Sequence, residues 1–375
     1  MKNEILICTS VLQLINAKAA MSFSNSRRKS NKMVLIIHPL LEMANIKQIL
    51  SISKKLKFDK VINIVEDIKI LEKDIKICRN SVSILLPNKR LKKIYKLENV
   101  FRERLLKKYP IFANKDNNIY LRSNYKYIDT VVLSVFHKPH IFKIDDGLAD
   151  YLDQYWFFYR LNFHQIKFFF RNVIIKFYYF LIFLFTNGLN TSLYKIIFYR
   201  YVNFKDKFSV KPAQNSKLIS KYFFNVLGNL RSKKISEKIL IIGTTIDKNY
   251  LYNVRDETKI YNKLIEIIVK EHGVRNNQIL YKHHPRVSYK DWKYKKKYLN
   301  CNLLKFSNDI LAETLMSNQN LISIYSFGST SLIYAKKLFK IDSNLVYFKN
   351  SKRHPSSNEM YLYIAKKEKI KVIYI

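Results

Sequence analysis

Residues 238–244 read KILIIGT and residues 278–283 read QILYKH, and the segment Glu257–His272 between them has helical length and spacing. Both quoted runs are short and apolar and lead into loops, which is typical of buried strands. A strand, a helix and a second strand in this order favour a βαβ unit with parallel strands. This stretch therefore predicts an α/β fold around a mainly parallel sheet.

The same alternation continues on both sides of this unit. Downstream, we predict strands at Asn320–Tyr325, Asn344–Phe348 and Lys371–Ile375, and helices at Asp309–Ser317, Ser329–Phe339 and Glu359–Lys367. Upstream, the predicted strands are Ile5–Cys8, Met33–Ile37, Lys60–Val65, Ser81–Leu86, Asn118–Leu121, Thr130–Val135 and His140–Ile144, and the helices Leu12–Phe23, Leu41–Lys54 and Arg90–Lys107. Two such sheets predict two Rossmann-like domains facing a cleft, with ligands at the carboxyl ends of the strands.

The middle of the chain differs from both halves. We predict an N-terminal Rossmann-like domain over 1–150, a helical apolar and basic insertion over 151–235, and a C-terminal Rossmann-like domain over 236–375. Tyr155–Lys205 contains no Asp or Glu and is crowded with Phe, Tyr, Ile and Leu. A spanning helix needs about 20 mostly apolar residues, so a transmembrane segment fits poorly. Amphipathic helices on an anionic membrane or against a partner subunit are favoured over an insertion buried in the protein's own core.

The charge of the chain is strongly positive. Its 375 residues include 68 Lys+Arg against 28 Asp+Glu, a formal net charge of +40. Lys, Asn, Ile, Tyr and Phe are abundant together, as AT-rich codon usage produces, so part of this charge has no functional meaning. The remainder favours a polyanionic partner: nucleic acid, anionic lipid or acidic glycan. The hydrophobic fraction of 48% excludes general disorder.

The cysteines and the N-terminus predict a cytoplasmic protein. Cys8, Cys78 and Cys301 are odd in number and far apart, so they indicate neither a disulfide framework nor a zinc site. Residues 1–10 form a short strand-like run that lacks the apolar core and cleavage site of a signal peptide.

An acidic pair follows one predicted strand of the N-terminal half. Asp145 and Asp146 come directly after Ile144, and Gly147 allows a sharp turn. Adjacent residues on a strand point to opposite sides, so one carboxylate can face a cleft and act as a general base. An ordinary Asp-Asp-Gly turn is the alternative.

A histidine pair ends one predicted strand of the C-terminal half. The sequence there runs Lys282, His283, His284, Pro285, Arg286. Imidazole beside cationic side chains suits an anionic leaving group, with histidine as the acid. His-Pro also occurs at 38–39 and 354–355, so the dipeptide alone proves little. A metal site fits poorly, because adjacent side chains diverge.

Hydroxyl-bearing loops follow three more predicted strands. The main one predicts a phosphate cradle before the helix Ser329–Phe339, with an ordinary helix cap as the alternative, and contains Ser326, Gly328, Ser329, Thr330 and Ser331. It lacks the Gly-Lys-Ser/Thr signature of a Walker loop. Weaker candidates are Gly243-Thr244 and Thr9-Ser10.

Together these residues predict transfer of a group from a nucleotide-activated donor to a hydroxyl. The carboxylate would deprotonate the acceptor, while His284 and the hydroxyl loop would neutralise the departing phosphate.

The ordered set resembles a known group of enzymes. Asp145-Asp146-Gly147, His284-Pro285 and Ser329-Thr330-Ser331 are similar, in order, to the acidic-acidic-Gly, His-Pro and Ser/Thr motifs of bacterial sialyltransferases. The most similar groups are the capsular polysialyltransferases and the lipooligosaccharide sialyltransferases. Residues 9–14, TSVLQL, are also similar to the loop after the first strand of the lipooligosaccharide group, which makes Thr9, Ser10 and Gln13 candidates on the acceptor side.

The resemblance implies a GT-B fold, CMP-sialic acid as donor, and an inverting transfer that needs no metal or other cofactor. It implies Asp145 or Asp146 as base, with Asp247 in reserve, and His284 as acid. The donor's nucleotide and phosphate would be bound in the C-terminal domain, by Gly243, Thr244, His283, Pro285, Arg286, Ser326, Gly328, Ser329, Thr330 and Ser331. The expected partners are a cell-surface glycan acceptor that ends in galactose or sialic acid, and the anionic inner face of the cytoplasmic membrane. The enzyme would be peripheral at that face. A homodimer is a further alternative.

Two non-catalytic functions remain as alternatives. A nucleic-acid-binding protein would share the charge but should carry a recognisable reading module, and none is present in the sequence. We therefore expect no nucleic-acid partner. A membrane-surface scaffold would explain residues 155–205 but not the motif loops.

Overall fold

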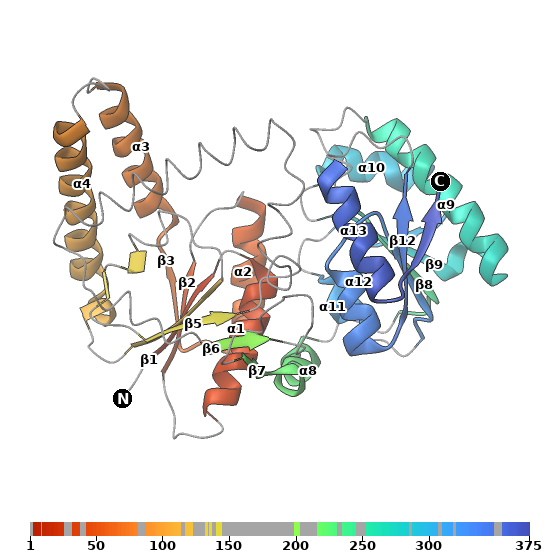
Figure 1. Cartoon of the computed structure of the whole chain (residues 1–375), viewed down its shortest axis with the longest axis horizontal. Coiled ribbons are helices and arrows are strands. Elements are labelled where there is room, and N and C mark those ends of the chain that lie inside the picture. The colour runs from red at the N-terminus through yellow and green to blue at the C-terminus, as the bar shows by residue number, and fades with distance from the viewer. Residues whose placement is uncertain are drawn as a thin grey trace. The chain divides into compact units, whose positions relative to one another are not determined.

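The computed structural model divides the chain into two compact units, Met1–Val226 and Leu227–Ile375. The structure describes residues 3–8, 10–25, 32–37, 43–81, 87–113, 117–122, 132–133, 135–136, 140–144, 199–202, 216–230, 235–244, 253–284, 287–306, 310–317, 320–348 and 355–375. Each unit is built around a parallel sheet (Figure 1). The predicted α/β fold with two parallel sheets is confirmed.

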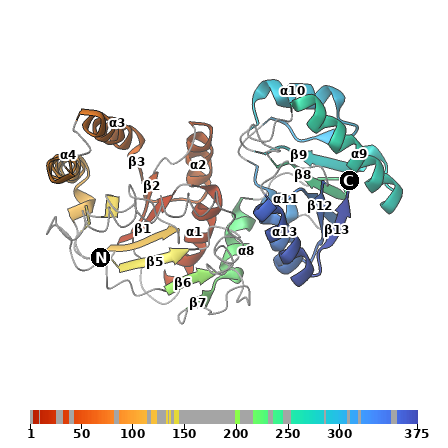
Figure 2. The ribbon, with the colours of Figure 1, turned by 45° about the horizontal axis from the view of Figure 1, so that its top comes forward.

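The first unit contains a seven-stranded sheet in the order β3-β2-β1-β4-β5-β6-β7, with every pairing parallel. In Figure 2, β5, β6 and β7 extend this sheet on one side of β1. The strands are β1 (Asn3–Cys8), β2 (Lys32–Ile37), β3 (Lys60–Asn63), β4 (Asn117–Arg122), β5 (His140–Ile144), β6 (Tyr199–Val202) and β7 (Ser216–Leu218).

Helices cover both faces of this sheet, which is why β1 is buried along its whole length. Helix α1 contacts β1, β4 and β5 and packs beside α2. Helices α3 and α4 lie side by side in Figures 1 and 2. The helices are α1 (Val11–Asn25), α2 (Met43–Lys55), α3 (Val65–Ser81), α4 (Pro87–Lys108), the 3-10 turn η1 (Pro110–Ala113) and α8 (Ser220–Asn229).

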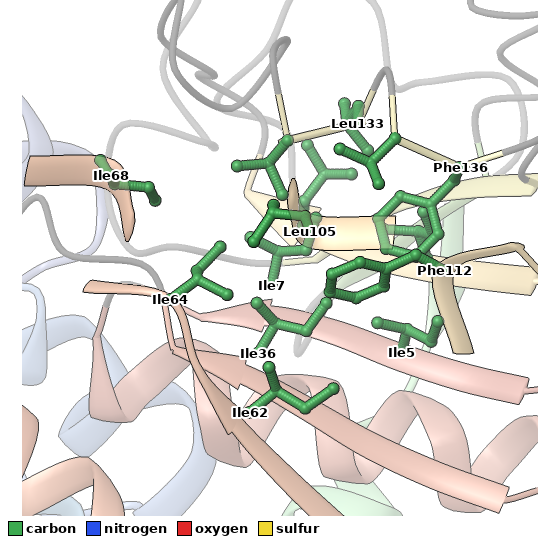
Figure 3. Close-up of a cluster of buried hydrophobic side chains, with 14 of the residues drawn as sticks. Ile5, Ile7, Ile36, Ile62, Ile64, Ile68, Leu105, Phe112, Leu133 and Phe136 are labelled. Atoms are coloured by element: carbon green, nitrogen blue, oxygen red, sulfur yellow. The ribbon is translucent and has the colours of Figure 1, made fainter. Parts of the chain in front are cut away.

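The core of the first unit joins the sheet to the α3–α4 side (Figure 3). Ile5 and Ile7 point from one face of β1, as the two-residue repeat of a strand requires. They pack in one cluster with Ile68 of α3, Leu105 of α4 and Phe112 of η1. Alternate residues of β1 therefore pack on opposite faces of the sheet, Ile5 and Ile7 on one and Leu6 and Cys8 on the other.

The second unit contains a six-stranded parallel sheet in the order β10-β9-β8-β11-β12-β13. Its strands are β8 (Ile239–Ile242), β9 (Ile279–Lys282), β10 (Asn302–Leu303), β11 (Ser323–Ser326), β12 (Asp342–Tyr347) and β13 (Lys371–Tyr374). The quoted βαβ stretch is the centre of this sheet, because β8 and β9 are hydrogen-bonded neighbours.

Local signals in the sequence explain the ends of the longest helix in this unit. The side chain of Asn253 accepts a hydrogen bond from the Asp256 N–H at the start of α9 (Val254–His272), and Gly273 ends it at φ 61°. The other helices are the 3-10 turn η5 (Asn276–Gln278), α10 (Tyr289–Tyr298), α11 (Ala312–Met316), α12 (Ser331–Tyr334), the π-helix η6 (Ala335–Phe339) and α13 (Pro355–Lys367).

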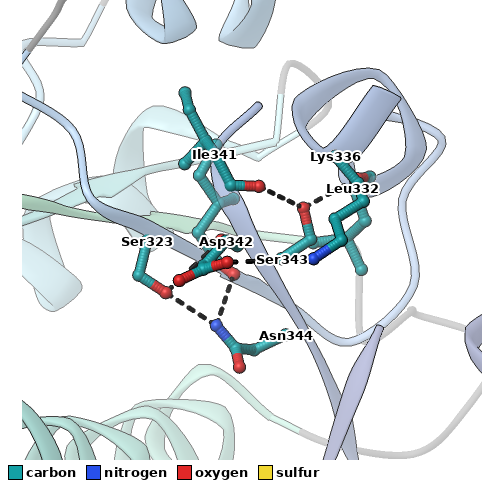
Figure 4. Close-up of polar contacts among 8 residues, drawn as sticks. Ser323, Leu332, Lys336, Ile341, Asp342, Ser343 and Asn344 are labelled. Atoms are coloured by element: carbon teal, nitrogen blue, oxygen red, sulfur yellow. Dashed lines mark hydrogen bonds and ion pairs between the residues drawn. The ribbon is translucent and has the colours of Figure 1, made fainter. Parts of the chain in front are cut away.

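A buried polar cluster ties α12 to the sheet (Figure 4). The Ser343 hydroxyl lies 2.9 Å from the Leu332 carbonyl and 3.2 Å from the Ile341 carbonyl, and so can donate to either. The Asn344 side-chain N–H donates to the Ser323 hydroxyl at 2.7 Å. These bonds fix the helix that follows the Ser329–Ser331 loop.

Several predicted elements are wrong or incomplete. Thr130–Val135 is not a strand where the structure describes it, because Val135 and Phe136 N–H groups donate to the Val132 and Leu133 carbonyls in a helical turn. Ser81 ends α3, and the rest of the predicted strand Ser81–Leu86 lies outside the described residues. Helices α3 and α10 were not predicted, whereas α8 lies within the expected helical insertion.

The described ends of the expected helical insertion over 151–235 include strands. β6 and β7 continue the first sheet, and α8 crosses the boundary between the units. Residues 151–198 and 203–215 lie outside the described residues. Among the described helices, none is long and apolar enough to cross a membrane.

Candidate active site in the second unit

The candidate donor-binding residues follow three adjacent strands of the second sheet. The neighbouring strands β9, β8 and β11 run parallel, so the loops after them leave the same edge. The strand order reverses between β8 and β11, which is where open α/β sheets bind ligands. The sequence predicted Gly243-Thr244, His283-His284 and Ser326–Ser331 at this edge, and the structure places them there.

The loop after β8 requires a glycine. A Cβ at Gly243 would lie 2.4 Å from the Tyr281 hydroxyl oxygen and 3.0 Å from the Lys282 carbonyl oxygen. The Gly243 N–H donates to that carbonyl at 2.8 Å, joining the loop to the end of β9. Thr244 is buried, and its Oγ1 has no hydrogen-bond partner.

A buried polar network supports this loop from below. The Thr244 N–H donates to the Tyr261 hydroxyl at 3.2 Å. Lys295, which is fully buried, donates to the Tyr281 hydroxyl at 3.1 Å and pairs with Glu257 at 2.7 Å. Burial raises the pKa of both tyrosines and of Glu257, so both hydroxyls stay protonated. The network links α9, α10 and β9 to the loop.

The loop after β9 contains a buried lysine followed by two histidines. The Lys282 ammonium donates to the His283 carbonyl at 3.3 Å. Burial lowers the pKa of Lys282 to about 8, although the charge of Glu313 opposes the shift. The Val287 N–H donates to the His284 carbonyl at 3.0 Å, on either side of Pro285 and Arg286 in the sequence. Those two residues lie outside the described ones.

The two histidines have different environments. His283 is buried and its ring stacks on Phe306 with centroids 5.3 Å apart. Burial, followed by the charges of Lys282 and Lys295, lowers the pKa of His283 to about 4, so its ring is neutral at pH 7. Its Nδ1 is buried without a partner. His284 is half-buried and is the more accessible of the two rings.

The loop after β11 orders its hydroxyls by internal bonds. The Ser326 hydroxyl donates to the Ile242 carbonyl of β8 at 3.0 Å. Gly328 has φ 130°, which a side chain would disfavour. The Ser331 N–H donates to the Ser329 hydroxyl oxygen at 3.2 Å. The predicted helix Ser329–Phe339 begins at Ser331 and changes to a π-helix at Ala335.

One residue that contacts this loop was not among the predicted site residues. Glu313 of α11 is buried and accepts a 2.9 Å hydrogen bond from the Ser331 hydroxyl. In the sequence, Glu313 is marked only as a carboxylate in the first turn of the short helix AETLM. Glu257 and Lys295 were also missed.

The candidates of the first unit are only partly described. The Ser10 hydroxyl oxygen accepts the Gln13 N–H at 3.2 Å and so caps α1, while Gln13 is buried. Thr9, Asp145, Asp146 and Asp247 lie outside the described residues. In the described part of the chain, no three His, Cys, Asp or Glu side chains form a metal site.

Solved structures identify the class of fold. The GT-B domain of a sialyltransferase from Photobacterium damselae, residues 113–497, has a TM-score of 0.52 and 11% identity, with 100% of each chain covered. Another sialyltransferase structure from Photobacterium damsela has a TM-score of 0.51 and 11% identity, covering 100% of this chain and 81% of that one. The chain therefore has the GT-B fold of glycosyltransferases.

Comparison of the sequence with known families identifies the family of the chain. Residues 4–347 match the sequence profile of the alpha-2,8-polysialyltransferase family. No curated protein sequence matches the chain significantly. The profile spans most of the chain, and the chain belongs to the alpha-2,8-polysialyltransferase family. It is thus a sialyltransferase, a glycosyltransferase with CMP-sialic acid as donor.

Proposed function

We propose that the protein is an inverting, metal-independent sialyltransferase that extends a sialic acid chain on a cell-surface glycan. In the proposed step, the acceptor hydroxyl oxygen attacks the anomeric carbon of the donor, and the bond from that carbon to the phosphate oxygen breaks. CMP leaves, and a carboxylate takes the hydroxyl proton. The family favours a sialic acid acceptor over a galactose-ended lipooligosaccharide.

One observation carries the donor site: loops from three adjacent parallel strands present polar groups at the switch point of the second sheet. Two buried side-chain atoms there, Thr244 Oγ1 and His283 Nδ1, have no partner. Leaving a buried polar atom unpaired costs about 1–3 kcal/mol, so a bound ligand would recover this energy. We assign the nucleotide of CMP to these atoms.

The phosphate is assigned to the loop after β11 and to His284. The Ser329 oxygen already accepts from the Ser331 N–H, which leaves its own proton to donate to a phosphate oxygen. Because His283 is neutral and buried, it is a poor acid, whereas half-buried His284 can carry a proton to the leaving phosphate. This supports His284 as the acid.

The base is assigned to the acidic pair after β5. Asp145 and Asp146 follow Ile144, the last residue of that strand, and Asp247 is the reserve. A leaving nucleoside monophosphate carries less charge than a diphosphate, so His284, Lys282 and hydroxyl donors suffice without a divalent cation.

We also propose that the enzyme works at the inner face of the cytoplasmic membrane. The supporting observations are the formal charge of +40 and the exposed lysines of α10, Lys290, Lys293, Lys296 and Lys297. Contact of residues 155–205 with the membrane or with a partner subunit stays a prediction. Sedimentation with anionic vesicles, compared with neutral ones, tests the membrane proposal.

The function is tested by incubating the protein with CMP-sialic acid in EDTA, with oligosialic acid or lactose as acceptor. We expect CMP release and α2,8-linked product with oligosialic acid. His284→Ala should lower transfer at least 100-fold, whereas His354→Ala, in another His-Pro pair, should not. Absence of CMP release with both acceptors would refute the donor. Activity that is lost in EDTA and restored by Mg²⁺ would refute metal independence.

A further inference from the structure

Glu313 contacts one loop of the donor site although it lies outside that loop. Its Oε1 accepts the Ser331 hydroxyl at 2.9 Å, and both side chains are buried. Ser331 in turn donates its N–H to the Ser329 oxygen at 3.2 Å. A fixed relay therefore runs from the Glu313 carboxylate to the Ser329 hydroxyl.

The same carboxylate acts on the end of β9. Its charge raises the pKa of Lys282, against the effect of burial. The Lys282 ammonium donates to the His283 carbonyl, and the Lys282 carbonyl accepts from the Gly243 N–H. A buried cation is stable only with a nearby anion or strong hydrogen bonds. The charge of Glu313 thereby favours the ammonium form of Lys282.

Direct contact of Glu313 with the donor is unfavourable, because both the carboxylate and the phosphate are anionic. The hydrogen bonds of Glu313 and Ser331 give Glu313 an indirect function. With its hydroxyl proton committed to Glu313, Ser331 has no proton for the phosphate. Ser329, which Ser331 orients, still has a hydroxyl proton for the phosphate.

We propose that Glu313 is a positioning residue of the donor site, which holds the loop after β11 through its hydrogen bond to Ser331. The inference rests on the proposed function and adds a residue to it. It also gives two residues of the Ser/Thr motif different roles: Ser329 contacts the phosphate, and Ser331 does not.

The test is calorimetric titration of the full chain with CMP. Glu313→Leu removes the acceptor and the charge, and should raise the Kd for CMP at least tenfold. Glu313→Gln keeps an acceptor oxygen for Ser331 and should raise it about threefold or less. Ser331→Ala should resemble Glu313→Leu, and the double variant should bind no more weakly than the weaker single variant, because both break one relay.

A matched control is Glu271→Leu, which removes a carboxylate from the last turns of α9, where the helix approaches the amino end of the sheet. Its Kd should equal that of the wild type. If Glu313→Leu and Ser331→Ala only lower the melting temperature while their folded fractions bind CMP normally, Glu313 is merely structural and the inference is wrong. If Glu313→Leu does not fold, Ser331→Ala and Glu313→Gln decide by the same criterion. Failure of the wild type to bind CMP would instead overturn the proposed function, and this inference with it.

Discussion

The two sheets share a strand order, but the loops at the point where that order reverses differ in their hydrogen bonding. The order β3-β2-β1-β4-β5 of the first sheet corresponds to β10-β9-β8-β11-β12 of the second. The loop after β1 thus occupies the place of the loop after β8, at the switch point. In the loop after β1, the Ser10 hydroxyl oxygen caps α1. In the loop after β8, Thr244 Oγ1 is buried without a hydrogen-bond partner.

The buried polar groups of the two sheets are also distributed differently. In the first, Asn3 bonds to Asn117 and Glu4 to Asn118, at the amino ends of β1 and β4. The second sheet has such a pair too, Asn344 with Ser323 near the amino ends of β12 and β11, but it also buries Lys282 and Thr244 at the carboxyl ends. Equal topology therefore does not give equal chemistry. The second sheet keeps polar capacity for a ligand, and the loop after β1 uses its own for its backbone.

The largest effect on this comparison should come from the buried ion pair under the β8 loop. Lys295→Met leaves Glu257 buried without its cation, and such a change costs about 3–5 kcal/mol. Denaturant unfolding should show this loss in the free energy of unfolding. Lys371→Met removes the partner of Glu271 from a more exposed pair and should cost about 1 kcal/mol or less. Equal losses in the two variants would contradict the supporting role of Lys295.

Next in size is a methyl group at Gly243. In Gly243→Ala the new Cβ would meet the Tyr281 hydroxyl, which Lys295 holds in place, so overpacking should cost about 1–3 kcal/mol. The displaced loop should also bind CMP at least tenfold more weakly. Gly228→Ala is the control, because no atom lies within 4 Å of its Cβ position and helix α8 favours alanine. An unchanged Kd in Gly243→Ala would separate this loop from the donor site.

The position of the candidate donor loops could be predicted from sequence for a simple reason. Short apolar runs that end in Gly, His or Ser mark the carboxyl ends of parallel strands, and adjacent strands bring such ends together. Thr130–Val135 failed because a short apolar run fits two structures. Val132, Leu133, Val135 and Phe136 are all buried at the spacing of one helical turn.

The supporting residues were not predictable in the same way. Lys295 lies in a helix with the sequence YKDWKYKKKY, whose composition indicates a solvated surface, and tertiary packing buries that lysine. Glu313 meets Ser331 across 18 residues that separate two elements. No periodicity in the sequence encodes a contact of that kind.

A third prediction tests whether Thr244 is kept for a ligand. Thr244→Val keeps the shape but removes a buried hydroxyl that has no partner, so the free protein should become more stable by about 1–3 kcal/mol. CMP binding should weaken several-fold in the same variant. Thermal unfolding with and without CMP measures both effects. Lower stability in the absence of CMP would show that the hydroxyl already has a structural partner.

The smallest effect is expected at the equivalent loop of the first sheet. Ser10→Ala removes the cap of α1 and should cost about 1 kcal/mol, because the Gln13 N–H loses its acceptor. Here stability falls where Thr244→Val raises it, and the Kd for CMP should stay within about twofold of the wild type. Ser10→Thr keeps an acceptor oxygen and should restore most of the stability. If Ser10→Ala weakened CMP binding as much as Thr244→Val, the two switch points would share the donor, and the division of labour between the sheets would be wrong.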